Sequence, residues 1–86
     1  MTRQEILKGI EDVACEYLGR TFELRPEMKL REDLELDSLQ WVTLAIEVEN
    51  HFHIYLEDED ELAIQSVGDL VDTVHRKLQP GTLPSG

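Results

Sequence analysis

The chain has 86 residues, with 19 acidic and 8 basic side chains and a formal net charge of -11. This length is enough for one domain with a single modest core, and a second domain does not fit. The charge repels nucleic acid and anionic membrane surfaces, and it favours protein partners with basic patches. Because no apolar run reaches the about 18 residues of a membrane span or resembles a signal peptide, we expect no membrane insertion. The single cysteine fits a reducing compartment, so we expect a cytoplasmic protein, and we also expect a monomer.

The first predicted helix begins after Thr2, because Thr2 and Glu5 three residues later form a capping box. Apolar residues then recur at helical spacing, and Gly19 is a typical helix stop. The face expected in the core comprises Ile6, Ile10, Val13, Ala14 and Tyr17. Cys15 falls on the opposite side and is the single cysteine, which excludes an intramolecular disulfide. We interpret Cys15 as a surface thiol and not as a catalytic one.

A long connection follows between Gly19 and Asp37, and Pro26 excludes a continuous helix there. Loops of this length are uncommon in compact domains unless they are pinned or functional. Its apolar residues have no steady period: Phe22, Leu24, Met28, Leu30, Leu34 and Leu36. We expect them to fill gaps between the helices and to leave room for one short helical turn.

The second helix is predicted from Ser38 to about His51. Asp37 is a good N-cap, and Gln40 completes a capping box. Ser38 is then the first helical residue, where unsatisfied amides and the positive end of the helix dipole would hold a phosphate esterified to its hydroxyl. No lysine or histidine lies near Ser38 in the sequence to activate it as a nucleophile. An exposed serine hydroxyl that is not activated as a nucleophile is typical of a site to which another enzyme attaches a group.

Two apolar stripes run along this second helix. The stripe expected in the core comprises Trp41, Leu44, Ala45, Val48 and Phe52. The other comprises Leu39, Val42 and Ile46, and it is rotated by about a quarter to a third of a turn from the first. Either the long loop folds over this second stripe, or the stripe is a docking surface for partners, to which Glu47 and Glu49 would add negative charge.

A short third helix is expected around Asp58 to Leu62, because acidic residues are favoured at helix N-termini. The alternating acids partly match a calcium loop, but Ala63 stands where that loop requires glycine. His51 and His53 are two residues apart and lack a third ligand nearby, so we expect no metal site.

The last helix is capped by Ser66 with Asp69. Its apolar residues recur at i, i+3, i+4, i+7 and i+11, which is the clearest amphipathic pattern in the chain: Val67, Leu70, Val71, Val74 and Leu78. Arg76 and Lys77 lie in its last turn, where positive charge complements the dipole. We therefore predict an all-α fold over residues 1–78, a small four-helix bundle with a long first loop and a short third helix, and a disordered tail over residues 79–86.

The motif Asp37-Ser38-Leu39, with Asp33-Leu34 just upstream and Leu30 before that, resembles the signature of the acyl carrier proteins. The resemblance extends from the first helix to Leu78. It implies that a phosphopantetheinyl transferase, using coenzyme A and magnesium, attaches 4'-phosphopantetheine to Ser38. The arm would then bear acyl groups as thioesters.

The resemblance also implies which proteins act on the chain. They would be acyl-transferring or acyl-activating enzymes of fatty-acid, polyketide or related lipid biosynthesis that recognise the second helix through basic patches. This favours docking as the role of Leu39, Val42 and Ile46. The chain itself would be a carrier and not an enzyme. In some members the core encloses part of the acyl chain, and Ala45 could leave room for it or simply permit close helix packing.

Several positions depart from the family pattern. Glu35 stands where many members have glycine, so we expect a loop backbone that does not depend on glycine's conformational freedom. Gln40 and Thr43 replace residues that are often acidic, Tyr55 stands where proline is common, and Trp41 is bulky for its place. These differences indicate a specialised carrier serving a dedicated pathway.

The rival interpretation is an acidic helical interaction module without a prosthetic group, in which Ser38 is only a neighbour of the helix cap. An enzyme is a more distant alternative, because the sequence offers no paired carboxylates, nucleophile and base, or metal cluster.

Overall fold

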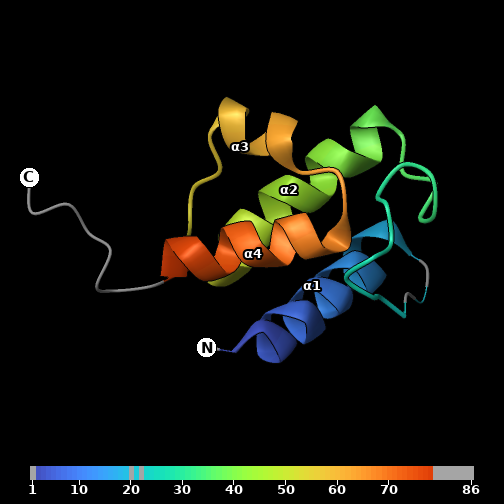
Figure 1. Cartoon of the computed structure of the whole chain (residues 1–86). Coiled ribbons are helices and arrows are strands. Elements are labelled where there is room, and N and C mark those ends of the chain that lie inside the picture. Colours follow the sequence, from blue (N-terminus) through green and yellow to red (C-terminus); the bar gives the residue numbers. More distant parts are fainter. Residues whose placement is uncertain (1, 20, 22, 79–86) are drawn as a thin grey trace, which may run out of the picture.

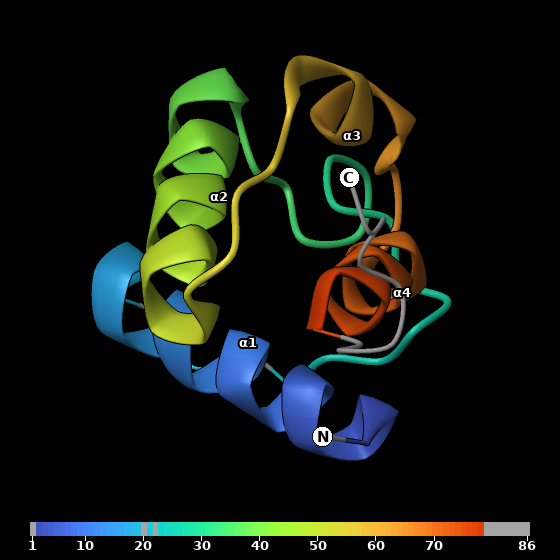
Figure 2. The same ribbon diagram turned by 90° about the vertical axis from the view of Figure 1, so that its left-hand side faces the viewer.

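The computed structural model describes residues 2–19, 21 and 23–78. This part of the chain forms four helices: α1 (Arg3–Leu18), α2 (Ser38–Phe52), α3 (Asp58–Ala63) and α4 (Val67–Leu78). They surround one core, with α1 below, α2 and α4 on either side and the short α3 above (Figures 1 and 2). The predicted small four-helix bundle is therefore confirmed. The disordered tail expected over residues 79–86 lies outside the described residues. So does Phe22, which we expect to fill a gap between the helices.

Helix α1 begins and ends as its sequence predicts. The hydroxyl of Thr2 accepts a hydrogen bond from the Glu5 amide at 3.2 Å, and the Glu5 carboxylate accepts one from the Thr2 amide at 2.8 Å. Gly19 ends the helix in the left-handed conformation, at φ 71°. The buried face comprises Ile6, Ile10, Val13 and Ala14.

One residue expected on that buried face lies at the surface instead. Tyr17 is 49% exposed, because its hydroxyl reaches the carboxylate of Glu47 in α2. In this position the ring of Tyr17 can contact the protein while its hydroxyl stays exposed to solvent and forms a hydrogen bond. The negative charge of Glu47 raises the pKa of Tyr17. Cys15 is partly buried, in agreement with its expected place off the main stripe.

The core is mainly aliphatic and draws on every long helix and on the loop. Besides the α1 residues it contains Leu44, Ala45, Val48 and Phe52 of α2 and Val67, Leu70, Val71 and Val74 of α4. Helix α3 contributes no buried residue of its own, and it is held at its two ends by Leu56 and Ile64, which are buried. Trp41, expected in the core, only packs against its edge.

The long loop is pinned to the chain just before and at the start of α4. Its residues Leu24, Leu30, Leu34 and Leu36 are buried, as expected. Backbone hydrogen bonds also join the loop to the α4 region, a second attachment that no pattern of side chains indicates. The Leu30 amide donates to the Gln65 carbonyl at 3.0 Å, and the Val67 amide donates to the Met28 carbonyl at 2.8 Å. One hydrogen-bonded turn, closed by the Asp33 amide on the Lys29 carbonyl at 2.9 Å, corresponds to the expected short helical turn.

A glycine permits the closest approach between this loop and α4. The Gly68 amide donates to the Pro26 carbonyl at 2.8 Å. A Cβ atom at Gly68 would lie 2.9 Å from that same oxygen, so a side chain there would force the loop away.

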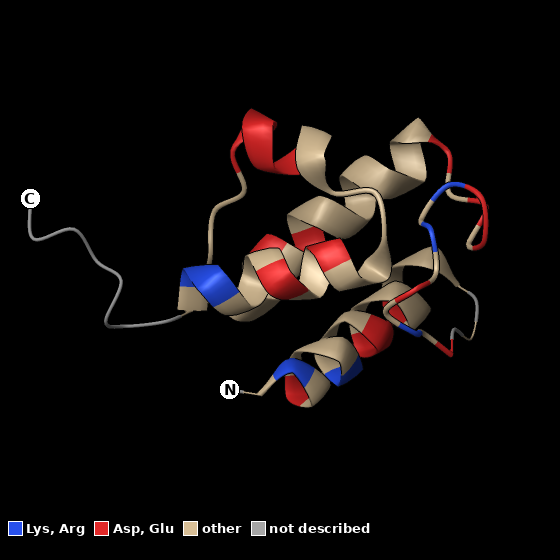
Figure 3. Ribbon diagram, in the orientation of Figure 1, with Lys and Arg blue, Asp and Glu red and all other residues tan. Residues whose placement is uncertain are grey.

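Charged side chains are unevenly distributed over the bundle. Acids gather at the start of α3 and basic residues occupy the last turn of α4, while the loop carries both kinds (Figure 3). There Arg76 and Lys77 both pair with Asp60 of α3, beyond their expected interaction with the helix dipole. No helix among residues 2–19 and 23–78 has the length and apolar character needed to span a bilayer.

Candidate functional site

The motif identified in the sequence lies at the N-terminus of the 15-residue helix α2. A carboxylate oxygen of Asp37 accepts a hydrogen bond from the Gln40 amide at 2.8 Å, and the Gln40 side chain accepts one from the Asp37 amide at 3.2 Å. This is the predicted capping box. It places Ser38 as the first residue of the helix, exposed to solvent.

The loop that leads into this helix adopts a conformation that the sequence analysis did not expect. Glu35 lies in the left-handed region at φ 56°, between the buried side chains of Leu34 and Leu36. Glycine adopts this conformation freely, whereas a residue with a Cβ does so at a cost of about 1–2 kcal/mol. The expectation that the backbone does not need glycine's freedom here was therefore wrong. Burial of the two leucines holds the strained residue in place.

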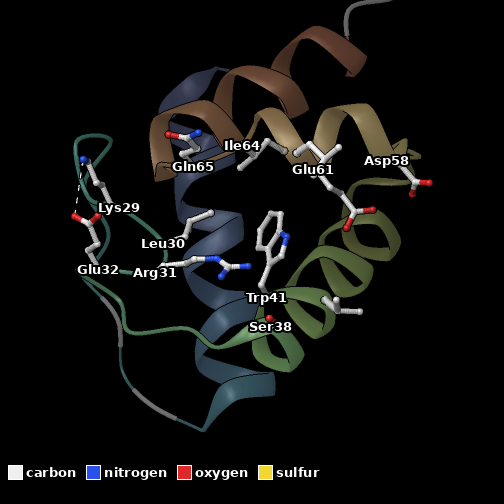
Figure 4. A pocket seen from close by; sticks show the side chains of 12 residues that line it. Lys29, Leu30, Arg31, Glu32, Ser38, Trp41, Asp58, Glu61, Ile64 and Gln65 are labelled. Atoms are coloured by element: carbon white, nitrogen blue, oxygen red, sulfur yellow. Dashed lines mark ion pairs between the residues drawn. The ribbon is translucent and has the colours of Figure 1, made fainter.

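A hollow of about 680 Å³ opens beside Ser38, between the loop, α2 and α3 (Figure 4). The ring of Trp41 stands inside it below Ile64, and Arg31 extends into it from the loop. Glu61 enters it from α3. The lining comprises Lys29, Leu30, Arg31, Glu32, Ser38, Trp41, Val42, Asp58, Glu61, Leu62, Ile64 and Gln65.

Glu61 is the residue of the hollow whose titration is altered. Partial burial raises the pKa of its carboxyl, and the negative charges of Asp58, Glu49 and Asp60 add to the effect. The hollow therefore combines an apolar floor with a positive side chain on the loop side and a carboxyl group on the α3 side.

The second stripe of α2 is open to solvent. Leu39 is 75% exposed, Val42 44% and Ile46 48%, so the loop does not fold over them. The two acids expected to accompany this stripe have partners within the chain. Glu47 accepts from Tyr17, and the Glu49 carboxylate accepts a hydrogen bond from the Leu56 amide at 2.6 Å.

The model of the phosphopantetheine attachment site family matches residues 8–74. The chain belongs to the acyl carrier protein family. An acyl carrier protein from Rubrobacter xylanophilus is 41% identical over 75 residues, which cover 86% of this chain and 93% of the relative. One from Exiguobacterium is 34% identical over 79 residues, covering 91% of this chain and all of the relative.

A solved structure supports the same assignment. A candidate acyl carrier protein from Mycobacterium tuberculosis superposes with a TM-score of 0.77 at 27% identity, covering 83% of this chain and 96% of the other. The domain of this family carries a covalently attached 4'-phosphopantetheine arm.

The residues around Ser38 fit such an arm. The hydroxyl is exposed at a helix N-terminus, where the first amides lack carbonyl partners within the helix and stabilise negative charge. Arg31 adds a positive side chain in the same hollow, and the apolar wall formed by Leu30, Trp41 and Ile64 can cover uncharged parts of the group. The N-terminus of α2 would thus stabilise a phosphodiester at Ser38, while the hollow beside it carries charges of both signs.

Sequence reasoning found the serine and its cap but not the hollow, most of whose lining residues it did not connect with the site. Arg31, Glu61 and Ile64 come from the loop, from α3 and from the residue after α3, and they meet only in the folded chain. Nothing in their spacing could have brought them together. The position of Trp41 on the apolar stripe of α2 predicts a core residue, whereas the structure places its ring at the edge of the core and in the lining of the hollow.

Proposed function

We propose that this acyl carrier protein bears acyl intermediates as thioesters on a 4'-phosphopantetheine arm attached to Ser38. The observation that carries the proposal is the placement of this hydroxyl, which is exposed on the first residue of a capped helix and lies within the motif Asp37-Ser38-Leu39. The arm supplies the thiol that forms the thioester, and the protein supplies position and recognition.

Attachment requires little chemistry from the chain itself. The Ser38 oxygen would form a bond to the phosphorus on the pantetheine side of coenzyme A, and the pyrophosphate bond would break to release adenosine 3',5'-bisphosphate. The transferase would supply Mg²⁺ and take up the serine proton, because no histidine or lysine among the described residues pairs with Ser38. The first-turn amides of α2 would then hold the phosphodiester.

Partners would dock on the exposed stripe of Leu39, Val42 and Ile46, which lies on the same helix as the attachment serine. A net charge of -11 would speed encounter with enzymes that present basic patches, such as the phosphopantetheinyl transferase and acyl-transferring or acyl-activating enzymes. Glu47 and Glu49 would contribute to this field, although their carboxylates also have partners within the chain. Once docked, a tethered acyl group is present at an effective concentration on the order of mM.

We also propose that this is a specialised carrier of fatty-acid, polyketide or related lipid biosynthesis, acting as a cytoplasmic monomer. Gln40 and Thr43 leave the first two turns of α2 without acidic side chains, whereas the first turn of α3 is acidic throughout. A partner's basic patch would therefore meet its main negative charge on α3, beside Leu62, which is 80% exposed.

Intact-mass analysis tests the attachment. The chain is incubated with a promiscuous phosphopantetheinyl transferase, coenzyme A and Mg²⁺, and the expected result is a gain of one pantetheine arm. Ser38→Ala should abolish the gain, while the control Ser85→Ala should retain it. An unchanged mass of the wild-type chain, under conditions in which the transferase loads another carrier, would favour an interaction module without a prosthetic group.

A further inference from the structure

The space within reach of Ser38 is an open hollow and not the helical core. Ala45, which could have left room inside the bundle, is buried at 3% exposure among closely packed neighbours of the core cluster. The hollow of about 680 Å³ has Ser38 in its own lining and is within the usual size range of small-molecule sites. A group carried on the arm can thus return to the surface beside its own attachment point.

Trp41 has the largest side chain of the residues that line this hollow. Its ring lies between Leu30 on the loop side and Ile64 above (Figure 4), and it is partly buried against the edge of the core. Within the described part of the chain the contact between rings is that of His51 with Phe52, and Trp41 takes no part in it. An indole that has no aromatic neighbour and faces an open space can stack on a planar ligand, in the offset or edge-to-face geometry that aromatic rings prefer.

The openness of the hollow also distinguishes rigid from flexible cargo. When a saturated chain binds, each bond that becomes fixed costs conformational entropy. An open hollow buries only part of the surface of the chain, so the free energy gained by burial is small. A rigid planar group has no such bonds to immobilise. The hollow therefore favours a flat group over a flexible one of the same size.

The hollow also contains a hydrogen-bond donor that could bind an oxygen on such a planar group. Arg31 extends from the loop toward Trp41 and has no ion pair with any described residue, whereas the neighbouring Lys29 pairs with Glu32 at 3.8 Å. Its guanidinium can donate hydrogen bonds to a carbonyl, hydroxyl or carboxylate oxygen held against the ring.

We propose that the hollow beside Ser38 selects planar acyl groups, aromatic or conjugated, with Trp41 as the stacking surface and Arg31 as the donor to an oxygen substituent. The inference rests on the proposed attachment of the arm at Ser38. It names the substrate class of the carrier, which the attachment site alone does not define.

The test compares acyl groups of equal size but different shape. The transferase loads the chain from benzoyl, cyclohexanecarbonyl or 4-hydroxybenzoyl coenzyme A, and intact mass establishes that each is fully loaded. We expect the benzoyl form to melt at least about 2 °C above the cyclohexanecarbonyl form. We also expect it to shift the NMR signal of the indole N–H, which is easily assigned because Trp41 is the single tryptophan.

Two pairs of variants separate the roles of the side chains. Trp41→Leu should erase the difference between the benzoyl and cyclohexanecarbonyl forms, whereas Trp41→Phe should preserve it. Arg31→Gln should remove the additional stabilisation by the 4-hydroxyl group, and Lys29→Gln in the same hollow should not.

Three results would contradict the inference while leaving the attachment intact. The first is an equal melting temperature of the fully loaded benzoyl and cyclohexanecarbonyl forms. The second is a difference in melting temperature between these forms that persists in Trp41→Leu. The third is a shift of the indole N–H signal that is as large with the bare arm as with the benzoyl group. An unchanged intact mass would instead overturn the attachment at Ser38, and this inference with it.

Discussion

The Asp60 carboxylate of α3 lies 2.9 Å from the Lys77 ammonium in the last turn of α4. Arg76 pairs with the same carboxylate at 3.1 Å, and the Asp60 side chain is 15% exposed. Because α3 buries none of its own residues, this ion pair is a principal contact that holds α3 over the hollow. The hydrogen bond from Lys77 lowers the pKa of Asp60.

Removal of this contact should destabilise the fold. We expect Lys77→Ala to lower the free energy of unfolding by ~1 kcal/mol at neutral pH. An acid with a lowered folded pKa contributes stability above its unfolded pKa and loses it as the pH falls through the folded value. The difference between Lys77→Ala and wild type should therefore shrink in acid, as measured by urea unfolding at several pH values. Lys8→Ala removes an exposed lysine with ion pairs at 3.6 Å and should change little, so equal effects of the two variants would contradict this account.

Relief of backbone strain at Glu35 should stabilise the chain. Glu35→Gly removes the cost of a side chain at φ 56°, and part of the gain is lost because glycine is more flexible in the unfolded state. We expect a net gain of up to about 1 kcal/mol in thermal or chemical unfolding. Glu35→Gln removes the charge but keeps the strain. If it stabilises as much as glycine does, charge repulsion and not the backbone is responsible.

The exposed stripe should matter for partners and not for folding. Val42 is 44% exposed, so Val42→Asp should change the free energy of unfolding by no more than about 0.5 kcal/mol. It should slow loading by the transferase at limiting carrier concentration, because docking is weakened. Leu44→Asp, at a position 1% exposed on the other side of α2, should unfold the chain. Unaltered loading of Val42→Asp would show that partners do not use this stripe.

The Glu61 carboxyl should have the opposite pH dependence from Asp60. Its raised pKa means that burial disfavours the charged form, so stability falls as the pH rises from the unfolded to the folded pKa of this carboxyl. Glu61→Gln should raise the melting temperature at neutral pH, and the gain should disappear as the pH falls below the pKa of the carboxyl in the unfolded chain. Glu59→Gln, at an exposed position of the same helix, provides the matched control. A gain for Glu61→Gln that does not depend on pH would contradict the assigned burial effect.

Local chemistry was sufficient to predict the helices. The capping pairs Thr2 with Glu5 and Asp37 with Gln40 act over three residues, so the sequence shows them directly. The same holds for Ser38, whose position follows from its cap. Tyr17 was misplaced because its partner Glu47 belongs to another helix, which periodicity within α1 cannot reveal.

The features that escaped prediction depend on contacts between distant segments. The loop is pinned by backbone hydrogen bonds such as that from Leu30 to Gln65, which carry no side-chain signature. The conformation of Glu35 is imposed by burial of its neighbours and runs against its own preference. The hollow that brings Arg31 to Trp41 exists only after α3 has folded over the start of α2.

The central claim is that Ser38 carries the arm, and peptide mass mapping of protein from the producing cells tests it most directly. Fragment ions of the peptide that contains Asp37-Ser38-Leu39 should place the mass of phosphopantetheine, with or without an acyl group, on Ser38. A bare Ser38 in cells whose other carriers are modified, or an arm found on Ser66 or Ser85, would contradict the account.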